Sequence, residues 1–159
     1  MSDDDVAAAD DLSAMDEREA VREVTVRASG HEHVSAEHAS TFEVTSDDWL
    51  TPAGDCILAV EADTTPADVP RSFVDACRSR TATITAEFRA ADATETVTGH
   101  GHPDLSYEGD RSMVGRTSDH VDERTIMIGA DKAAAEFDRR LVTALERGAP
   151  LTVTLRVEP

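Results

Sequence analysis

Two stretches of the chain, residues 30–89 and 99–157, resemble each other closely enough to be diverged copies of one unit. A unit of roughly 70 residues has too little interior to be stable alone, so the copies are expected to share one core around an approximate twofold axis. The matching runs are Ser29-Gly30-His31-Glu32-His33 with Thr98-Gly99-His100-Gly101-His102, Thr45-Ser46-Asp47 with Thr117-Ser118-Asp119, and Ile57–Asp63 with Thr125–Asp131.

Each copy also carries a helix with one apolar face and ends in a strand with alternating apolar residues. The spacing i, i+4, i+7, i+8 predicts core-facing helices, the first beginning at Pro66 or Ala67, and the period of two predicts strands. Further strands are predicted at residues 22–28, 41–45 and 55–62. The helical faces are Val69, Phe73, Ala76, Cys77 and Phe137, Leu141, Ala144, Leu145; the alternating sets are Ala82, Ile84, Ala86, Phe88 and Leu151, Val153, Leu155, Val157.

This order of elements predicts an α+β fold built from two β-β-β-α-β repeats, with half-repeats at about 22–89 and 93–158. Eight strands with only two helices cannot form an open parallel sheet covered on both faces, so we expect a mixed sheet or a closed barrel with pseudo-twofold symmetry. Residues 21–159 are expected to form a single compact domain. Residues 1–20 are rich in acidic residues and contain no aromatic residue, which predicts a disordered tail.

The net charge of −18, with 33 acidic and 15 basic residues of which one is lysine, is typical of a halophile. In concentrated salt such a surface is screened, so its acidity says little about partners. Two isolated cysteines, Cys56 and Cys77, favour a reduced cytoplasm. No segment has the 18 or more apolar residues of a membrane span, so we expect a cytoplasmic protein without a membrane partner.

The most specific block of the chain is Leu50-Thr51-Pro52-Ala53-Gly54-Asp55-Cys56-Ile57; it occurs with Gly30-His31, Val34, His38, Arg124-Thr125 and Ala130-Asp131-Lys132-Ala133-Ala134. The order of these blocks resembles that of the archaeal domain-of-unknown-function family number 371. The resemblance runs from about residue 22 onward and, with the acidic composition, suggests a haloarchaeal member. It implies a cellular context and a fold without implying a reaction.

Lys132 is the single lysine of the chain and follows Asp131 where a strand is expected to lead into a helix. Free N–H groups at a helix N-terminus attract anions, so Asp131 and Lys132 are candidate ligand-binding residues. A catalytic lysine, or a solvent-exposed lysine beside a capping Asp131, are the alternatives. The corresponding residue of the first copy is Thr64, so the two copies differ here.

Four nearby residues, Arg116, Ser118, Arg124 and Thr125, could donate hydrogen bonds to a phosphate or a carboxylate. This hypothesis requires that neighbouring acidic residues face away from the cluster. Ordinary surface ion pairing is the alternative. The acidic neighbours are Asp119, Asp122 and Glu123.

Two histidine pairs, His31 with His33 and His100 with His102, have the i, i+2 spacing that places both rings on one side of an extended segment. Such pairs can chelate a divalent metal, particularly if the twofold axis brings both pairs together. Contacts to phosphate or nucleic acid, or a purely structural turn, remain as alternatives. A divalent metal is accordingly the one cofactor considered.

Cys56 adjoins Asp55, and a close His38 would complete the minimum for an activated thiolate. His31, His38 and Asp55 are therefore the candidate catalytic residues. The apolar run that follows Cys56 favours a buried and inert thiol instead.

These features lead to three hypotheses about function. The first is a binding module, with or without enzymatic activity, for an anionic ligand such as a nucleotide, a phosphorylated metabolite or RNA. With only four phenylalanines, one tyrosine and one tryptophan, a compact ligand is favoured over a long RNA strand. The second is a metal-dependent hydrolase or transferase that uses the paired histidines, and the third is a structural subunit whose strand edges pair with a partner. No oligomeric state is predicted.

Overall fold

Four long strands form an antiparallel sheet, called sheet A, in the order β1-β8-β4-β5. The computed structural model describes residues 20–159, so the predicted tail of residues 1–20 lies outside the described residues except for its last one. Strands β4 and β5 form a tight hairpin through Ala91, which has a positive φ of 54°. The strands are β1 (Glu23–Ser29), β4 (Thr83–Ala90), β5 (Ala93–His100) and β8 (Pro150–Glu158).

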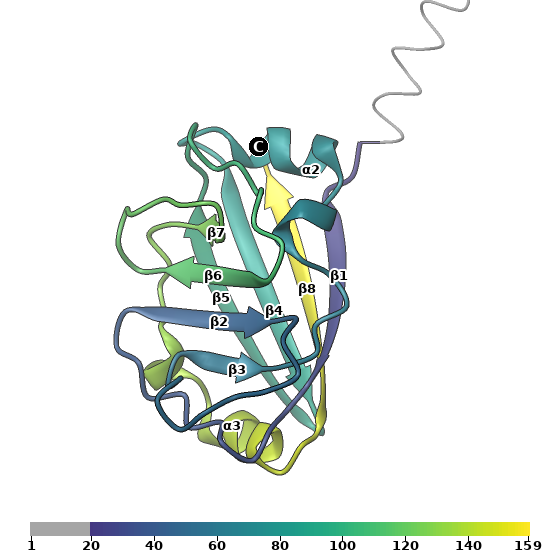
Figure 1. The fold of residues 1–159 in the computed structure, drawn as a ribbon. Helices are drawn as coiled ribbons and strands as arrows, with labels where there is room; N and C mark the ends of the chain where they lie inside the picture. The colour runs from purple at the N-terminus through teal and green to yellow at the C-terminus, as the bar shows by residue number, and fades with distance from the viewer. Residues whose placement is uncertain (1–19) are drawn as a thin grey trace, which may run out of the picture.

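Four shorter strands form a second sheet, sheet B, in the order β3-β2-β6-β7. The central pair β2–β6 is antiparallel, whereas the outer pairs β2–β3 and β6–β7 are parallel, so this sheet is mixed. Figure 1 shows sheet B lying across one face of sheet A. Its strands are β2 (Thr41–Thr45), β3 (Ile57–Ala59), β6 (Ser112–Arg116) and β7 (Thr125–Met127).

Two helices, α2 (Arg71–Cys77) and α3 (Arg139–Glu146), lie at opposite ends of the molecule. Each is preceded by a single 3-10 turn, η1 (Pro66–Asp68) or η2 (Ala134–Glu136). At the start of α3 the side chain of Asp138 caps the helix by accepting a hydrogen bond from the backbone N of Arg140 (2.8 Å).

The core lies between the two sheets and the helices. All of the alternating residues predicted for β4 and β8 are buried, and so are the predicted helical faces apart from Ala76 and Ala144, which are partly buried. Phe42, Phe88 and Phe137 pack together with ring centroids 4.9–5.7 Å apart. A cavity between the sheets, lined by residues such as Val26, Phe42 and Phe88, has a volume of only about 10 Å³, which is too small for a ligand.

The mixed α+β fold is confirmed, but the closed barrel is wrong. Within residues 20–159, backbone pairing joins sheets A and B at only two isolated bridges, Ser29–Val60 and His100–Ile128. Figure 1 shows that the strands of sheet B cross those of sheet A at an angle. At each bridge the edges of the two sheets therefore pair at a single residue pair, and no continuous row of backbone hydrogen bonds closes a barrel.

Two predicted elements are shorter than expected. The strand expected at residues 55–62 is regular only over Ile57–Ala59. The helix expected from Pro66 or Ala67 starts as a 3-10 turn, and the α-helix begins only at Arg71, after Pro70. Proline lacks an N–H and forces the preceding residue into extended backbone, which separates the two helical segments.

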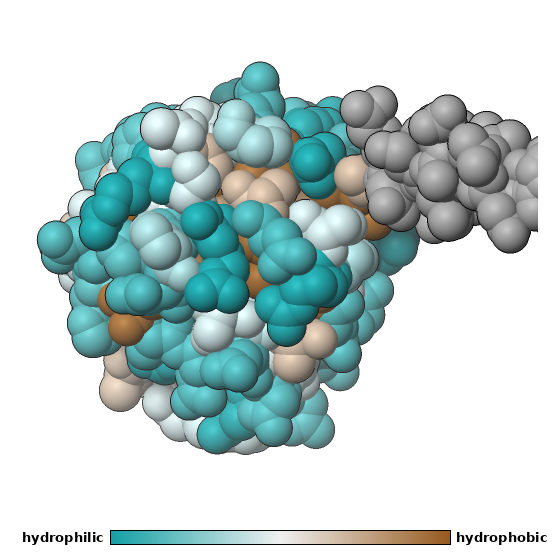
Figure 2. All heavy atoms as spheres, turned by 90° about the horizontal axis from the view of Figure 1, so that it is seen from above, coloured by the Kyte–Doolittle hydropathy of each residue, from teal (hydrophilic) through white to brown (hydrophobic). Residues whose placement is uncertain are grey.

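Within residues 20–159 no helix is long and apolar enough to cross a membrane. Figure 2 shows the α2 end of the molecule, where hydrophilic residues dominate and hydrophobic residues emerge only in small areas. This end of the molecule therefore presents no broad apolar surface.

Candidate functional site

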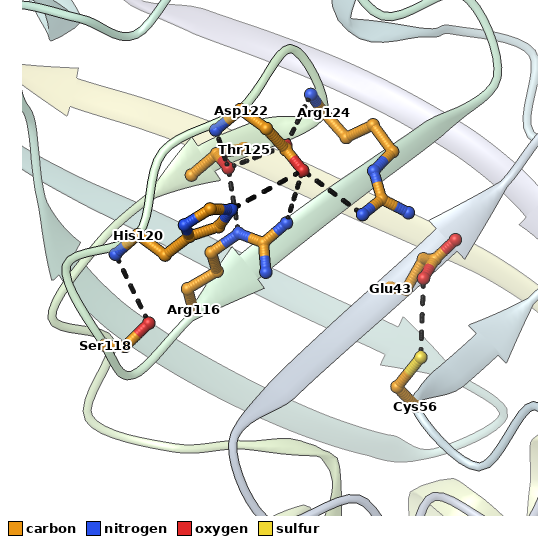
Figure 3. A network of polar contacts seen from close by, with 8 residues as sticks. All are labelled: Glu43, Cys56, Arg116, Ser118, His120, Asp122, Arg124 and Thr125. Atoms are coloured by element: carbon orange, nitrogen blue, oxygen red, sulfur yellow. Dashed lines mark hydrogen bonds and ion pairs between the residues drawn. The ribbon is translucent and has the colours of Figure 1, made fainter.

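The predicted donor cluster forms around the carboxylate of Asp122, in the segment between β6 and β7. Arg116 donates through Nε to Thr125 Oγ1 (2.9 Å) and through Nη2 to Asp122 Oδ2 (2.9 Å). Arg124 donates its backbone N to Asp122 Oδ1 (2.9 Å) and its Nη2 to Oδ2 (3.2 Å). In Figure 3 both guanidinium groups converge on this carboxylate, which therefore does not face away from the cluster as the sequence analysis assumed.

The cluster is consequently satisfied by the chain itself. Burial raises the pKa of Asp122, but hydrogen bonds from Arg124 and Thr125 and the charge of Arg116 outweigh it, so the pKa lies well below its ordinary value. The side chain of Ser118 accepts a hydrogen bond from the backbone N of His120 (3.3 Å) and serves the local turn. These contacts make the cluster a rigid connection between β6 and β7.

The depressed pKa of Asp122 makes its contribution to stability dependent on pH. This contribution is fully present above the ordinary carboxyl pKa of 3.8 and is lost as the pH falls through the folded-state value. We expect Asp122→Asn to lower the free energy of unfolding by about 1–2 kcal/mol at neutral pH and by less near pH 2. Urea titrations at both pH values measure this, with Asp119→Asn, which alters an exposed neighbour, as the control. An unchanged difference between wild type and Asp122→Asn across this range would contradict it.

Lys132 lies apart from this cluster and is paired with a buried carboxylate. Its Nζ donates to Glu95 Oε2 and to the backbone O of Thr96 (3.2 Å), and the hydrogen bond to Glu95 raises the pKa of Lys132. Asp131 Oδ1 accepts a hydrogen bond from the backbone N of Thr98 (2.9 Å). The expected helix start is a single 3-10 turn from Ala134, so Lys132 does not lie at the N-terminus of an α-helix.

The two histidine pairs lie at opposite ends of the fold. The backbone N of His31 donates to Leu145 O at the end of α3 (2.9 Å), whereas that of His102 donates to Cys77 O at the end of α2 (3.1 Å). Figure 1 shows how far apart these helices lie, so the fold does not bring the pairs together. Among residues 20–159 no group of three or more His, Cys, Asp or Glu side chains could hold a metal ion.

The imidazole nitrogens of the histidine pairs serve their own turns. His31 Nδ1 accepts a hydrogen bond from the backbone N of His33 (3.0 Å), and His102 Nδ1 accepts one from Asp104 (2.9 Å). His100 is exposed and forms the bridge to Ile128. The local contacts of His31 thus match those of His102. The repeat in the sequence had instead paired His31 with His100.

Cys56 does not have the surroundings of an activated nucleophile. Its Sγ donates to Glu43 Oε1 (3.4 Å), and burial together with the charge of Glu43 raises the pKa of the thiol to about 12. His38 Nδ1 accepts hydrogen bonds from the backbone N of Ser40 and of Thr41 (both 3.2 Å). Asp55 meets His38 through its backbone carbonyl, which accepts from the His38 N (3.2 Å). These contacts keep Cys56 as a thiol at neutral pH.

A cleft that the sequence analysis missed lies beside α3. It has a volume of about 430 Å³ and is formed by α3 together with the turn between β4 and β5. Its lining residues are Ala91, Asp92, Arg139, Arg140, Thr143, Ala144 and Arg147. The sequence feature that could have indicated this cleft is the spacing i, i+1, i+8 of Arg139, Arg140 and Arg147, which places the three arginines along one side of a helix.

The three arginines of this cleft differ in how far their charges are compensated. Arg140 pairs with Asp138 (2.9 Å). Arg139 donates only to backbone carbonyls, those of Ser35 (3.3 Å), Ala36 (3.1 Å), Ala134 (2.9 Å) and Phe137 (3.1 Å). Within the described part of the chain, neither Arg139 nor Arg147 has a carboxylate within ion-pair distance. The cleft therefore carries a net positive charge in a strongly acidic protein.

The edges of sheet A are partly blocked by the chain itself. On β1, Asp63 Oδ1 accepts from the backbone N of Arg27 (3.0 Å), and on β5, Asp131 Oδ1 accepts from that of Thr98 (2.9 Å). Each aspartate also donates its backbone N to the carbonyl of the same strand residue (2.9 Å). These contacts shorten the edge on which a partner strand would have to pair.

Comparison with known proteins gives the family. The family described as a domain of unknown function, DUF371, matches residues 26–158, which include nearly the whole of both sheets. An uncharacterised protein of Methanocaldococcus jannaschii is 36% identical over 129 residues, which cover 81% of this chain and 95% of that protein. With these two matches, the resemblance carried by the Leu50–Ile57 block is confirmed, and the chain belongs to the DUF371 family.

Proposed function

We propose that the protein binds a compact anionic ligand, such as a nucleotide or a phosphorylated metabolite, in the cleft beside α3. The observation that carries this proposal is the concentration of three arginines around one open cleft in a protein of net charge −18. The clusters expected to bind an anion, around Arg116 and Lys132, have their charges paired with Asp122 and Glu95. The cleft is therefore the better candidate.

The side chains of the cleft suit a phosphate group. Arg147 is exposed and has no ion pair among residues 20–159, so its guanidinium is free to form a bidentate contact. Arg140 keeps unused N–H donors beside its contact with Asp138, and Thr143 adds a hydroxyl group. Arg139 contributes charge, but most of its donors hold the chain near Ser35 and Ala36.

We further propose that the chain is an internal duplication, so that this cleft has a counterpart beside α2. Support comes from hydrogen bonds that recur at related positions, with an offset of 71 residues in the first part of each half and of 68 residues in the second. Ser29 N to Val60 O corresponds to His100 N to Ile128 O, and His31 N to Leu145 O corresponds to His102 N to Cys77 O. In the second case His31 of the first half donates to the second half, and His102 of the second half donates to the first half. A twofold relation requires such an exchange.

Backbone conformation supports the same correspondence. Among the described residues with positive φ, Ala36 (49°) corresponds to Tyr107 (53°), and Glu61 (59°) corresponds to Gly129 (57°). A side chain at positive φ is uncommon and costs energy, so its repetition at related positions favours common descent of the two halves.

The proposed counterpart beside α2 has a different charge. By the correspondence of Phe73 with Leu141, the residues related to Arg140 and Arg147 are Ser72 and Ser79. Ser72 Oγ accepts a hydrogen bond from the backbone N of Val21 (3.0 Å), which holds the start of the described chain against α2. Arg71 corresponds to Arg139 and is kept, so the two proposed surfaces differ at the positions of Arg140 and Arg147, which carry arginine only beside α3.

Binding of adenosine monophosphate tests the proposed function. We expect the double variant Arg140→Ala/Arg147→Ala to lose about tenfold or more in affinity, since it removes both guanidinium groups available for a charge-assisted contact with the phosphate. The matched control is Arg71→Ala/Arg80→Ala, which removes two exposed arginines at the α2 end and changes the net charge equally. Isothermal titration calorimetry in low and in molar salt measures both. Equal loss in the two double variants, or no binding by the wild type, would refute the proposal.

The composition supports a proposed cellular setting for this activity. We propose a salt-adapted archaeal cell and a cytoplasmic location, because 33 acidic residues face 15 basic ones and a single lysine remains. High salt weakens exposed ion pairs, so a bidentate contact by arginine is better suited to hold a phosphate there than a lysine.

A further inference from the structure

We propose that the ligand of the α3 cleft carries two phosphate groups separated by a ribonucleoside, as in a 5′-phosphorylated dinucleotide or a short RNA strand. This inference rests on the proposed function and specifies its ligand. It starts from the positions of Arg140 and Arg147, which lie near the start and at the end of α3 and both line the cleft.

The separation of the charges sets the length of the ligand. Arg140 and Arg147 are seven residues apart, which at a rise of about 1.5 Å per residue corresponds to about 10 Å along the helix. One phosphate group contacts both guanidinium groups only if the two side chains bend toward each other, which also brings two like charges close together. Two phosphates joined through a nucleoside reach both, and the second contact forms within the same complex.

The residues between the arginines favour a neutral middle portion. Thr143 and Ala144 line the cleft there, with a hydroxyl group and a small apolar side chain. Asp92 lines the cleft from the turn between β4 and β5. The pKa of Arg140 is raised mainly by its hydrogen bond with Asp138 and to a smaller extent by the charge of Asp92. A carboxylate in the cleft repels a continuous row of phosphates, whereas it accepts hydrogen bonds from ribose hydroxyls or a base amino group.

A series of ligands tests this inference: adenosine monophosphate, the dinucleotide pApA, its deoxy form, tripolyphosphate and an octamer of riboadenylate. We expect pApA to bind at least about tenfold more tightly than the monophosphate and than tripolyphosphate, since two bidentate contacts replace one. The deoxy form is expected to bind more weakly than pApA, because it lacks a hydroxyl donor for Asp92.

Single variants separate this inference from the proposed function. Arg140→Ala and Arg147→Ala are each expected to reduce the affinity for pApA to that for the monophosphate, and Asp92→Asn is expected to improve binding of tripolyphosphate. Equal affinity for pApA and monophosphate, with both still lost in the double variant, would overturn the two-phosphate ligand and leave the proposed function standing. No binding of any of these probes would overturn both.

The octamer identifies the source of the dinucleotide unit. The octamer offers several overlapping dinucleotide units, so its affinity is divided by their number before it is compared with that of pApA. Equal affinities after this correction support a free dinucleotide as the ligand. A tighter complex with the octamer supports a single-stranded RNA, with contacts that extend beyond the cleft.

Discussion

Lys132→Ala is expected to destabilise the protein by about 2–3 kcal/mol, which lowers the thermal midpoint by roughly 5–10 °C. The reason is the partner that the substitution leaves behind. The side chain of Glu95 is only 10% exposed, so removal of Lys132 leaves a buried carboxylate without its positive partner. This carboxylate still accepts hydrogen bonds from the backbone N of Asp138 (2.7 Å) and of Thr96 (3.2 Å). Because these donors remain and Lys132 is 35% exposed, the expected loss lies below that of a fully buried pair.

Chemical unfolding of four proteins measures this contribution. They are the wild type, Lys132→Ala, Glu95→Gln and the double variant, which form a double-mutant cycle. We expect the double variant to be less destabilised than the sum of the single variants. The control is Arg140→Ala, which breaks a pair whose arginine side chain is 82% exposed and should cost less than about 1 kcal/mol. A loss in Lys132→Ala no larger than that control would show that the lysine is only a surface residue.

Local sequence patterns predicted the parts of the fold that local patterns determine. The alternation in 81–89 and 151–157 identified two central strands, because strands with one buried face place apolar residues at every second position. It also identified the apolar faces of α2 and α3. The exact start of α2 depended on Pro70, and the short β3 on contacts with β2, so both boundaries were misplaced.

Long-range contacts explain why the candidate site was only partly predicted. Glu95 binds Lys132 across 37 residues, and Ser35 binds Arg139 across 104. Helical and strand periodicity in the sequence does not predict contacts between residues so far apart in the chain. The arginines of α3 were visible as a cluster, but the cleft also needs the turn at Ala91 and Asp92, far away in the chain. Conversely, three of the four residues of the predicted donor cluster, Arg116, Arg124 and Thr125, lie together around Asp122, and their mutual contacts leave little capacity for a ligand.

Within the proposed duplication, the packing favours a different pairing of the glycines from the one that the sequence predicts. The sequence paired Gly30 with Gly99, but the packing of Gly30 resembles that of Gly101. A Cβ atom on Gly30 would lie 2.0 Å from the carbonyl O of Leu145, and one on Gly101 would lie 2.1 Å from that of Cys77. Both carbonyls end a helix and accept the backbone N–H of the following histidine.

Gly30→Ala and Gly101→Ala are therefore each expected to destabilise the protein by more than about 3 kcal/mol, and by similar amounts. The obstacle in each case is a backbone carbonyl, which moves only if the end of the helix moves with it. Such a shift would also break the hydrogen bond from His31 to Leu145 (2.9 Å) or from His102 to Cys77 (3.1 Å). Equality of the two effects follows from the proposed duplication, since the two sites would be copies of one contact.

Gly54→Ala is the control for this pair, because its Cβ would meet the ends of two flexible side chains, Leu50 Cδ1 (2.8 Å) and Ile57 Cδ1 (3.2 Å). We expect it to cost no more than about 1 kcal/mol, since those side chains can adjust. Urea titrations followed by circular dichroism compare the three variants, and a variant that is already unfolded without urea counts as the predicted severe loss. If Gly30→Ala were tolerated like the control while Gly101→Ala unfolded the protein, the two loops would not be equivalent and the duplication would lose its strongest structural support.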